Sequence, residues 1–536
     1  MNARAPTRYS LAVEHHDVIV VGSGFGGSVS ALRLAEKGYR VLVLEKGRRF
    51  AAKDFPETNW DLRRWMWKPE VGMRGIFQMS FFEHVTILHG VGVGGGSLVY
   101  ANTLPVPSDG FFRAPSWAHL AADWRKELEP HYATARQMLG ANPNPVETRG
   151  DRVLAEIARD IGRAEHHHPA DVAVYFGQPG VTVPDPYFGG AGPARTGCIH
   201  CGACMTGCRH GAKNTLDLNY LWLAEQAGAV VRAETEVTAI RPRPGGGYVV
   251  ETRGSLGGGK GALAADKVIF AGGVLGTMQL LLAMQEDRAG LPNLSPRLGD
   301  GVRTNNEALI GVIAPDEDDL AHGIAITSIL HTDEHSHIEP VRYGRGSGFF
   351  RLMSLPHSTG TTIAARVAGA AGGFLRHPVK WARALGVRDF ARKSQVLLYM
   401  RTLESTLSLR RGRSPWTAFR TGLITQLADG APAPTAFLPE ATDLAERFAQ
   451  KVGGVTMTLL TETLLGVPST AHILGGACMG KDAGEGVIDT DHQVFGYPGL
   501  YVIDGAAVSA NPGVNPSLTI TALAERAMAR VPAKTN

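Results

Sequence analysis

The chain has 536 residues, of which 44% are hydrophobic and 66 are glycine, and its net charge is +4. This length predicts two or more domains, and the composition is typical of a globular α/β protein rather than of a disordered or fibrous chain. The small net charge and the lack of a nucleic-acid-binding motif give no reason to expect a nucleic-acid partner. No apolar run approaches the roughly 20 residues of a membrane span. The N-terminus lacks the apolar centre of a secretory signal, so we expect a cytoplasmic protein.

The segment 18–45 contains an apolar strand, the glycine motif G-x-G-x-x-G, a helix, a second strand and an acidic residue, in that order. The glycines allow a tight turn and a close approach of the backbone to a pyrophosphate, and an acid at this spacing typically binds a ribose hydroxyl. The unit predicts a dinucleotide site but does not distinguish NAD from FAD. The residues expected there are Gly22, Ser23, Gly24, Phe25, Gly26, Gly27, Glu45 and Lys46.

A second glycine cluster follows in the segment 87–102, which reads ILHGVGVGGGSLVYAN. So many glycines together indicate a backbone that lies against a large ligand. The segment 265–282 reads as a strand, a Gly-Gly turn and a helix, and adds a further βα element to the same sheet. From the second cluster we expect cofactor contacts at Gly92, Gly94, Gly95, Gly96 and Ser97.

Four of the five cysteines lie close together in the segment 196–215 with the spacing C-x2-C-x2-C-x3-C. This spacing is that of the bacterial ferredoxin-type iron–sulfur run, although no proline follows the last cysteine and no second run is present. Zinc bound by four thiolates, one or two disulfides, and free thiols packed beside the sheet are the alternatives. The candidate metal ligands are Cys198, Cys201, Cys204 and Cys208.

The segment 360–395 combines seven Lys or Arg residues with a single acid, Asp389, and with several large apolar residues. A basic amphipathic stretch of this kind can lie on an anionic membrane surface. A solvated helical lid is the alternative. We therefore expect either a plain surface helix or a peripheral contact with a membrane.

Two stretches near the C-terminus, HILGGACMG from residue 472 and GLYVIDGAAVSANPGVNPSLTIT from residue 499, complete a resemblance. Together with the N-terminal unit and GVGGGSL (92–98), they make the chain similar to the glucose–methanol–choline (GMC) oxidoreductase family. Within that family the chain most resembles the bacterial cholesterol-oxidase-like flavoenzymes. The resemblance extends over 17–526. It implies FAD, a flavin domain assembled from separated segments, and a substrate domain whose sheet covers the isoalloxazine.

The resemblance also implies roles for individual residues. His472 matches the active-site histidine, and a histidine suits proton transfer because its usual pKa lies near neutrality. Asn515 matches the asparagine at the flavin edge, where an amide can hold the alcohol oxygen without changing charge. Further cofactor contacts are implied for Val237 near the adenine, for Asp504 and Gly505 along the FAD chain, and for Pro516 and Ser517 beside the flavin pyrimidine.

Sterol-active members of the family carry a glutamate that acts as a base when the double bond moves after oxidation. Glu339 is the best match, and Glu307 is its rival. Ser517 departs from the pattern, because well-studied sterol-active members often have an aromatic residue directly after Asn-Pro. Some dehydrogenases of the family carry an iron–sulfur cluster near a comparable cysteine stretch. No histidine follows the second glycine cluster as in relatives with linked cofactor, so we expect non-covalent FAD.

We therefore expect an α/β protein with a Rossmann-type FAD-binding domain assembled from separated segments and an α+β substrate domain with a mainly antiparallel sheet. Its function would be oxidation of a hydrophobic secondary alcohol, with a 3β-hydroxysteroid such as cholesterol favoured and O2 as acceptor. The alternatives are a dehydrogenase that uses a carrier or quinone, an oxidase of long-chain or terpenoid alcohols, and a non-catalytic flavin-binding protein. The expected segments are the FAD domain at 1–110, 196–300 and 466–536, a helical excursion at 111–195, and the substrate domain at 301–465.

Overall fold

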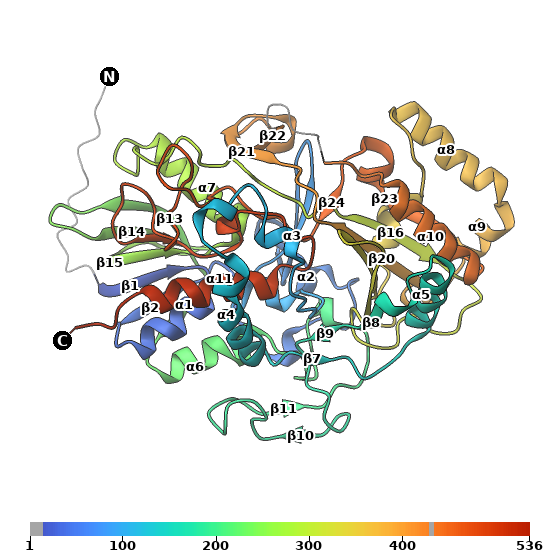
Figure 1. The fold of residues 1–536 in the computed structure, drawn as a ribbon, viewed down its shortest axis with the longest axis horizontal. Helices are drawn as coiled ribbons and strands as arrows, with labels where there is room; N and C mark the ends of the chain where they lie inside the picture. Colours follow the sequence, from blue (N-terminus) through green and yellow to red (C-terminus); the bar gives the residue numbers. More distant parts are fainter. Residues whose placement is uncertain (1–13, 428–433, 536) are drawn as a thin grey trace.

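The computed structural model describes residues 14–427 and 434–535. The expectation about a secretory signal falls mainly on residues 1–13, which lie outside the described residues. The molecule is elongated, with one large β-sheet in each half (Figure 1). Strand β1 (His15–Val21) and helix α11 (Ser517–Arg530) lie together in the half of the molecule opposite helices α8 (Ile363–Arg376) and α9 (Pro378–Leu385).

The first sheet is built around strand β1, whose buried run Val18–Val20 is apolar on both faces, as in a sheet covered on both sides. β1 pairs in parallel with β2 and with β15, and β15 also pairs in parallel with β25 from the C-terminal region. The antiparallel β14 and β13 extend the sheet beyond β15. The strands are β12 (Val230–Arg232), β2 (Val41–Leu44), β1 (His15–Val21), β15 (Lys260–Phe270), β14 (Tyr248–Gly254), β13 (Thr235–Pro242) and β25 (Leu500–Val502).

Helices cover both faces of this sheet. On one face α1 packs against α6 and α11, and α4 packs against α11, while α7 packs against β13 on the opposite face (Figure 1). The turn between β1 and α1 holds the predicted G-x-G-x-x-G motif, so the dinucleotide-binding unit has the expected order of elements. The helices are α1 (Phe25–Glu36), α4 (Trp124–Leu139), α6 (Tyr220–Gln226), α7 (Gly273–Glu286) and α11 (Ser517–Arg530).

The second sheet is antiparallel throughout. The side chains along each strand alternate between its two faces, both of which are apolar. One face packs against α5 (Arg149–Asp160) and α10 (Pro439–Lys451), and the helical spacing of the buried residues of α10 matches that contact. The other face lines the central cavity described below. In spatial order the strands are β19 (Ser354–Pro356), β23 (Val455–Leu459), β16 (Ala308–Ile313), β20 (Ser394–Arg401), β18 (Ser336–Val341), β17 (Ser328–His331) and β8 (His167–Pro169).

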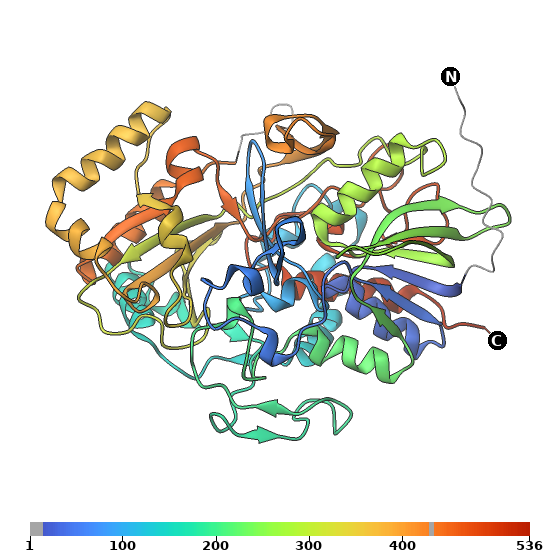
Figure 2. The ribbon, with the colours of Figure 1, turned by 180° about the vertical axis from the view of Figure 1, so that it is seen from behind.

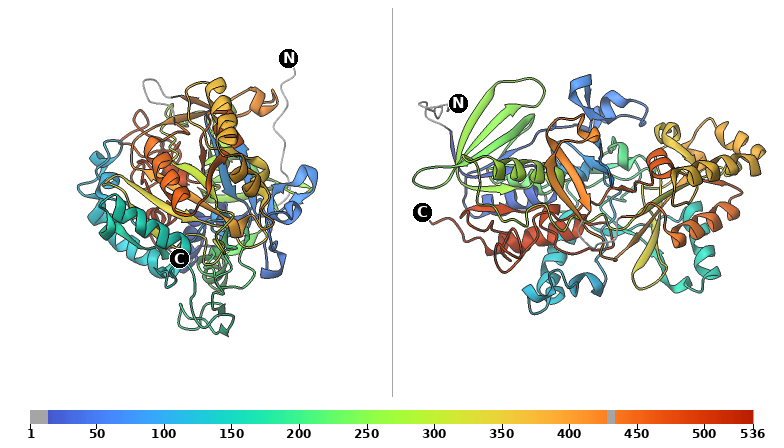
Figure 3. Two further views of the ribbon diagram at one scale, coloured as in Figure 1. Left: turned by 90° about the vertical axis from the view of Figure 1, so that its right-hand side faces the viewer. Right: turned by 90° about the horizontal axis from the view of Figure 1, so that it is seen from above.

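Smaller elements lie between and around the two sheets. The β5–β6 hairpin stands between them, with β21–β22 near its tip (Figure 2). Helices α8 and α9 project from the far end of the second sheet (Figure 3). These elements are β3 (Trp67–Lys68), β4 (Met73–Arg74), β5 (Phe77–Phe81), β6 (Thr86–Gly90), β7 (Asn142–Pro143), β9 (Asp171–Val172), β10 (Thr182–Val183), β11 (Arg195–Thr196), β21 (Leu407–Gly412), β22 (Gly422–Leu427), β24 (Ser469–Thr470), α2 (Leu62–Trp65), α3 (Asp109–Phe112), α8 (Ile363–Arg376) and α9 (Pro378–Leu385).

The fold class expected from the sequence is confirmed: a Rossmann-type sheet assembled from separated segments stands beside an α+β unit with an antiparallel sheet. The segment 111–195 is less uniform than the helical excursion we expected. Its helix α4 packs on the first unit, whereas α5 and β8 belong to the second. Among the described residues, no helix is both long and apolar enough to cross a bilayer.

Candidate active site

One continuous cavity of about 1060 Å³ joins the two sheets. At one end it is lined by the β1–α1 turn and by Thr235–Thr238 of β13, and at the other end by the apolar face of the second sheet. His472 and Asn515 line it between these ends. The cavity is thus long enough to hold a dinucleotide in the first unit and a second molecule against the second sheet.

The glycines of the first motif have two different surroundings. A Cβ at Gly22 would lie 2.3 Å from Ala271 O, and one at Gly26 would lie 1.6 Å from Ile503 O, so both are needed for close packing of backbone on backbone. A Cβ at Gly24 would meet no protein atom within 4 Å, and Gly24 lines the cavity at the start of α1. An open glycine at a helix N-terminus fits the approach of a pyrophosphate.

Glu45 also lines the cavity, and the protein itself holds its carboxylate in place. Ser23 Oγ donates to Glu45 Oε2 at 2.7 Å, and the amide of Gly47 donates to Oε1 at 2.8 Å. Its contact with a ribose hydroxyl stays a prediction. Most of the other predicted cofactor residues line the cavity as well: Gly22, Ser23, Gly24, Phe25, Gly26, Lys46, Gly95, Gly96, Val237, Asp504, Gly505, Asn515, Pro516 and Ser517.

Four predicted contact residues lie behind the cavity wall and support it. A Cβ at Gly27 would lie 2.1 Å from Gly22 O, so Gly27 lets α1 pack close to the turn. The amide of Gly94 donates to Ser23 Oγ at 3.1 Å, and Ser97 Oγ donates to Gly94 O at 2.7 Å. Gly92 O accepts from Ser23 Oγ at 3.3 Å. The second glycine cluster therefore braces the first turn as well as facing the cavity.

Asp504 connects the C-terminal strand β25 to α7. Thr277 Oγ1 donates to Asp504 Oδ2 at 2.6 Å, and the amide of Ala506 donates to Oδ1 at 2.8 Å. Burial raises the pKa of Asp504 to about 6, although these hydrogen bonds favour its charged form.

His472 forms a close pair with Glu307. His472 Nδ1 lies 2.5 Å from Glu307 Oε2, and the amide of Ala471 donates to Oε1 at 2.6 Å, so both oxygens of this carboxylate are used. Because a carboxylate only accepts, Nδ1 carries the proton of the neutral ring and Nε2 keeps a free lone pair. Burial alone would lower the pKa of His472. The charge and hydrogen bond of Glu307, together with the charge of Glu339, have the larger effect, so the pKa of His472 lies above its usual value.

Two sets of hydrogen bonds position Asn515: one to its own side chain, and one to the residues that precede it. Its Nδ2 donates to Glu339 Oε2 at 3.4 Å, and its Oδ1, which is buried, has no hydrogen-bond partner among the described residues. Asn305 clamps the preceding loop, because its Oδ1 accepts from the amide of Gly513 at 2.9 Å and its Nδ2 donates to Val514 O at 2.7 Å. An unpaired buried carbonyl at this position is available to a bound molecule.

Glu339 is fully buried on β18, and its side chain lies on the same face of the strand as that of Val341, which lines the cavity. Its Oε1 lies 3.3 Å from His337 Nε2, but neither atom has a hydrogen bond of good geometry among the residues described. Glu307 thus lines the cavity beside His472, whereas Glu339 is not among the lining residues and lies behind Asn515.

The far end of the cavity is apolar. Alternation along the antiparallel strands sends one set of side chains toward α5 and α10 and the other set into the cavity. The hairpin β21–β22 covers part of the same space and contributes Trp416 and Leu423. The apolar strand residues that line this end are Leu309, Gly311, Val341, Val396, Leu398, Met457 and Leu459, and the polar ones are Ser354, Ser394 and Thr458.

Two parts of the cavity wall were missed by the sequence reasoning. Gly272–Leu275, at the start of α7, lines the cavity, and the Gly-Gly pair after a predicted strand was the signal that could have assigned it. His89 of β6 also lines it. Burial, reinforced by the charge of Lys46, lowers the pKa of His89 to about 3, so it is neutral at ordinary pH. No motif marks such a histidine in the sequence.

Comparison with known proteins agrees with this geometry. Sequence profiles described as GMC oxidoreductase match residues 194–300 and 425–524, and a profile described as an NAD(P)-binding Rossmann-like domain matches 20–87. The chain is 47% identical to a cholesterol oxidase of Mycobacterium tuberculosis over 539 residues, covering 97% of this chain and 91% of the relative. It is 42% identical to a cholesterol oxidase of Acinetobacter baumannii, covering 97% and 95%.

A solved structure shows the same fold at low identity. The crystal structure of pyridoxine 4-oxidase from Mesorbium loti matches with a TM-score of 0.62 and 14% sequence identity, covering 96% of this chain and 98% of that one. The fold and the site together define an FAD-dependent alcohol oxidoreductase. The chain belongs to the glucose–methanol–choline oxidoreductase family, in the branch similar to the cholesterol oxidases. The open Gly24 and the unpaired Asn515 Oδ1 fit the cofactor of this family.

Proposed function

We propose that this enzyme oxidises the hydroxyl group of a 3β-hydroxysteroid such as cholesterol to the ketone, with O2 as acceptor and hydrogen peroxide as product. The observation that carries the proposal is the single cavity in which the dinucleotide cradle, the pair His472 and Asn515, and an apolar sheet face meet. The identity to cholesterol oxidases over nearly the whole chain supports the choice of a sterol.

In this proposal FAD, when bound without a covalent link, supplies the acceptor for the hydride that leaves the alcohol carbon. His472 Nε2 accepts the hydroxyl proton, because Nδ1 is already held by Glu307. Asn515 orients the alcohol oxygen, with Glu339 fixing the position of its amide. The apolar sheet face binds the steroid rings and excludes water from the reacting carbon.

The test is an anaerobic titration of the purified protein with cholesterol, followed by admission of air. Bleaching of the flavin bands and their recovery in air with stoichiometric peroxide would support an oxidase. Bleaching without recovery would overturn O2 as the acceptor and favour a dehydrogenase with a carrier or quinone. If long-chain or terpenoid alcohols bleach the flavin and cholesterol does not, the sterol is overturned as the substrate. If none of these alcohols bleaches it, a non-catalytic flavoprotein is favoured.

The role of Glu307 can be tested through the pH dependence of the reaction. His472 must be neutral to accept a proton, so kcat/KM falls as the pH drops through its raised pKa. In Glu307→Gln the negative charge that raises this pKa is lost, and we expect the acid limb of the kcat/KM profile to move to lower pH. Glu446→Gln removes an exposed charge on α10 and is the control. An acid limb that stays in place in Glu307→Gln would contradict the pairing.

For a sterol with a 5,6 double bond, we assign the base of the subsequent isomerisation to Glu339. Both oxygens of the rival Glu307 are taken by Ala471 and His472, whereas Oε1 of Glu339 has no hydrogen bond among the described residues. Glu339→Gln is expected to retain oxidation and to slow formation of the conjugated ketone by about 100-fold or more. The products are separated by chromatography, and the conjugated one is identified by its ultraviolet absorbance. Unchanged conjugation would exclude this role.

A membrane contact through α8 and α9 would suit a substrate that resides in a bilayer. Leu375 and Val379 are 80% and 71% exposed, and Lys380 lies beside them without an ion-pair partner in the part of the chain that the structure describes. Apolar side chains flanked by cations are typical of binding to anionic lipid surfaces. We propose that this projection contacts the membrane.

The variant Leu375→Asp/Val379→Asp is expected to reduce co-sedimentation with anionic vesicles about tenfold or more. Val71→Asp, at an exposed valine of the first unit, is the matched control. Co-sedimentation that is equal in all three proteins would show that α8 and α9 form a solvated surface only.

A further inference from the structure

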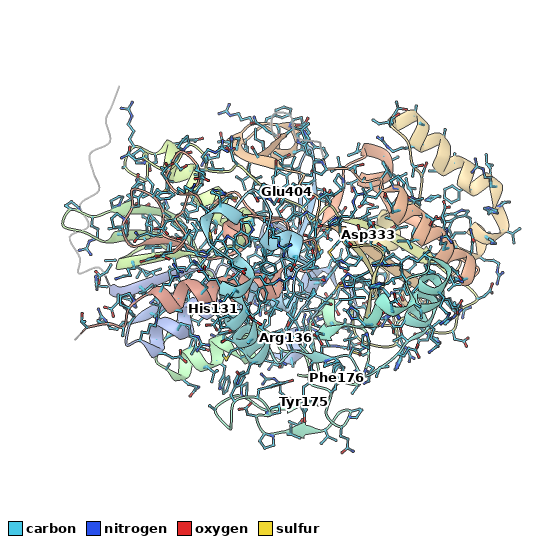
Figure 4. The ribbon with its side chains drawn as sticks, viewed as in Figure 1. His131, Arg136, Tyr175, Phe176, Asp333 and Glu404 are labelled. Carbon is cyan, nitrogen blue, oxygen red and sulfur yellow. The ribbon has the colours of Figure 1, made fainter. Side chains whose placement is uncertain are left out.

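A second, small cavity lies outside the active site, and all four clustered cysteines line it. Its volume is about 20 Å³, and its wall contains Cys198, Cys201, Cys204 and Cys208 together with Val174, Ile199, Ala203 and Ala212. None of the four cysteines forms a disulfide. The loop that carries them is fixed by backbone hydrogen bonds from Cys198 to Tyr175 O at 3.0 Å and from Gly202 to Gly323 O at 2.8 Å. Tyr175 and Phe176, labelled in Figure 4, mark the segment against which the loop packs.

The space between the cysteines has the wrong character for water, and no set of side chains around it holds a single metal ion among the described residues. A single water needs about 10–15 Å³ and two or more polar partners, and the wall of this cavity is mainly thiol and hydrocarbon. Tetrahedral zinc would draw four sulfurs to about 2.3 Å from one centre. Among the described residues, no three His, Cys, Asp or Glu side chains converge closely enough to hold an ion.

The backbone of the loop turns amide groups toward the thiols. The amide of His200 donates to Cys198 Sγ at 3.4 Å, and the amide of Ala203 makes the corresponding contact with Cys201, each two residues after the cysteine. His200 has a φ of 57° and Gly202 a φ of 72°, so both turns use the left-handed region. Hydrogen bonds to the sulfurs are one of the means by which proteins stabilise thiolate-bound clusters.

The charges around the cavity are positive. Lys213 and Arg209 line it, and no Asp or Glu does. Lys213 is almost fully buried, and its Nζ donates to Leu98 O and Cys204 O, both at 2.9 Å, with no carboxylate at ion-pair distance among the described residues. Arg342, also buried, lies behind Gly323 of the cavity wall and donates only to hydroxyl and carbonyl oxygens. Buried cations without an acidic partner are costly unless an anion lies nearby.

We propose that Cys198, Cys201, Cys204 and Cys208 bind one iron–sulfur cluster of the four-iron type. The ferredoxin-like spacing supplies the ligands, and all four thiols face the same cavity, so one cluster takes all four. The negative charge of a cluster bound by four thiolates balances Lys213 and Arg342. The assignment does not depend on the identity of the alcohol substrate.

The cluster site shares a wall with the active site. Met205, between Cys204 and Cys208, lines the large cavity, as does Tyr100. The Nζ of Lys213 lies 4.7 Å from the centre of the Tyr100 ring, so this lysine lies between the two cavities. The cluster would therefore be held beside the flavin site and not in a separate peripheral domain.

The experiment is to express the full chain together with cluster-assembly proteins, purify it without oxygen, and count iron, acid-labile sulfide, zinc and FAD per chain. We expect about four irons and four sulfides per chain, and an electron paramagnetic resonance signal after reduction by dithionite. One zinc per chain with no sulfide would overturn the proposal. Free thiols or disulfides with no metal, after anaerobic reconstitution with iron and sulfide as well, would also overturn it.

Two cysteine variants test whether the clustered cysteines bind the cluster. Cys204→Ser is expected to lose most of the iron and sulfide, while Cys478→Ser, which changes the fifth cysteine far from this cavity, keeps them. The flavin spectrum checks that each variant is folded. If Cys204→Ser does not fold, the iron and sulfide count of the unmodified chain still decides the question. Equal iron in Cys204→Ser and Cys478→Ser would contradict ligation.

Discussion

Replacement of His472 by alanine is expected to lower kcat by about 10²–10⁴-fold while the protein keeps its FAD. The ring lines the cavity beside Asn515, and Glu307 holds its Nδ1, which leaves Nε2 as the proton acceptor for the substrate. Without the ring, the hydroxyl proton has no acceptor in this position. The measurement is the anaerobic rate of flavin reduction by cholesterol, with FAD content determined from the visible spectrum.

The matched control for this change is His131→Ala. His131 lies on α4 (Figure 4) and is not among the residues that line the cavity, so its replacement is expected to leave the rate within a factor of about two. His472→Ala with a rate close to that of the unmodified enzyme would remove the histidine from the mechanism. Loss of FAD in His472→Ala would mean instead that the residue mainly shapes the cofactor site.

Gly24→Val is expected to weaken FAD binding by about 10–100-fold, which corresponds to the loss of a hydrogen bond to a charged group. The new side chain would point into open cavity at the start of α1, where we place the pyrophosphate, and would meet no protein atom within 4 Å at its Cβ. The folded protein should therefore keep its melting temperature in the absence of FAD. Binding is measured by titrating FAD into protein from which the cofactor has been removed.

Two further glycine variants make the comparison specific. Gly372→Val, on α8, adds the same side chain where nothing lies within 4 Å of the Cβ, and should leave FAD affinity unchanged. Gly26→Ala places a Cβ 1.6 Å from Ile503 O and should lower the melting temperature even without FAD. Normal FAD affinity in Gly24→Val would refute the proposed path of the pyrophosphate.

The dinucleotide-binding half of the fold was predictable because its signals are local. A buried strand, glycines at fixed spacing and an amphipathic helix lie within 18–45, and each is forced by backbone geometry or burial. The pairing of Glu307 with His472 was not predictable in the same way. The two residues are 165 positions apart, and the backbone bridge between Arg303 and Leu474 holds their segments together, with His472 Nδ1 at 2.5 Å from Glu307 Oε2.

In the second sheet, too, the sequence did not predict which side chains meet at the site. Every residue of β18 (Ser336–Val341) is buried, so the face that bears His337 and Glu339 is not a solvent face, as their polarity alone would suggest. The sequence named Glu339 as the best match and Glu307 as its rival, on resemblance alone. The two carboxylates differ in their polar partners: both oxygens of Glu307 accept hydrogen bonds, whereas among the described residues only Oε2 of Glu339 does, from Asn515.

The pairing of β25 with β15, and the contact of Gly26 with Ile503 O, have a consequence for the synthesis of the protein. The N-terminal glycine turn is made first, but its packing partner Ile503 is made 477 residues after Gly26, about 94% of the way along the chain. A nascent chain on the ribosome therefore has no complete cradle until almost the entire polypeptide has emerged. We therefore expect cofactor loading to wait until synthesis is nearly finished, and a chain that ends before β25 to hold no flavin.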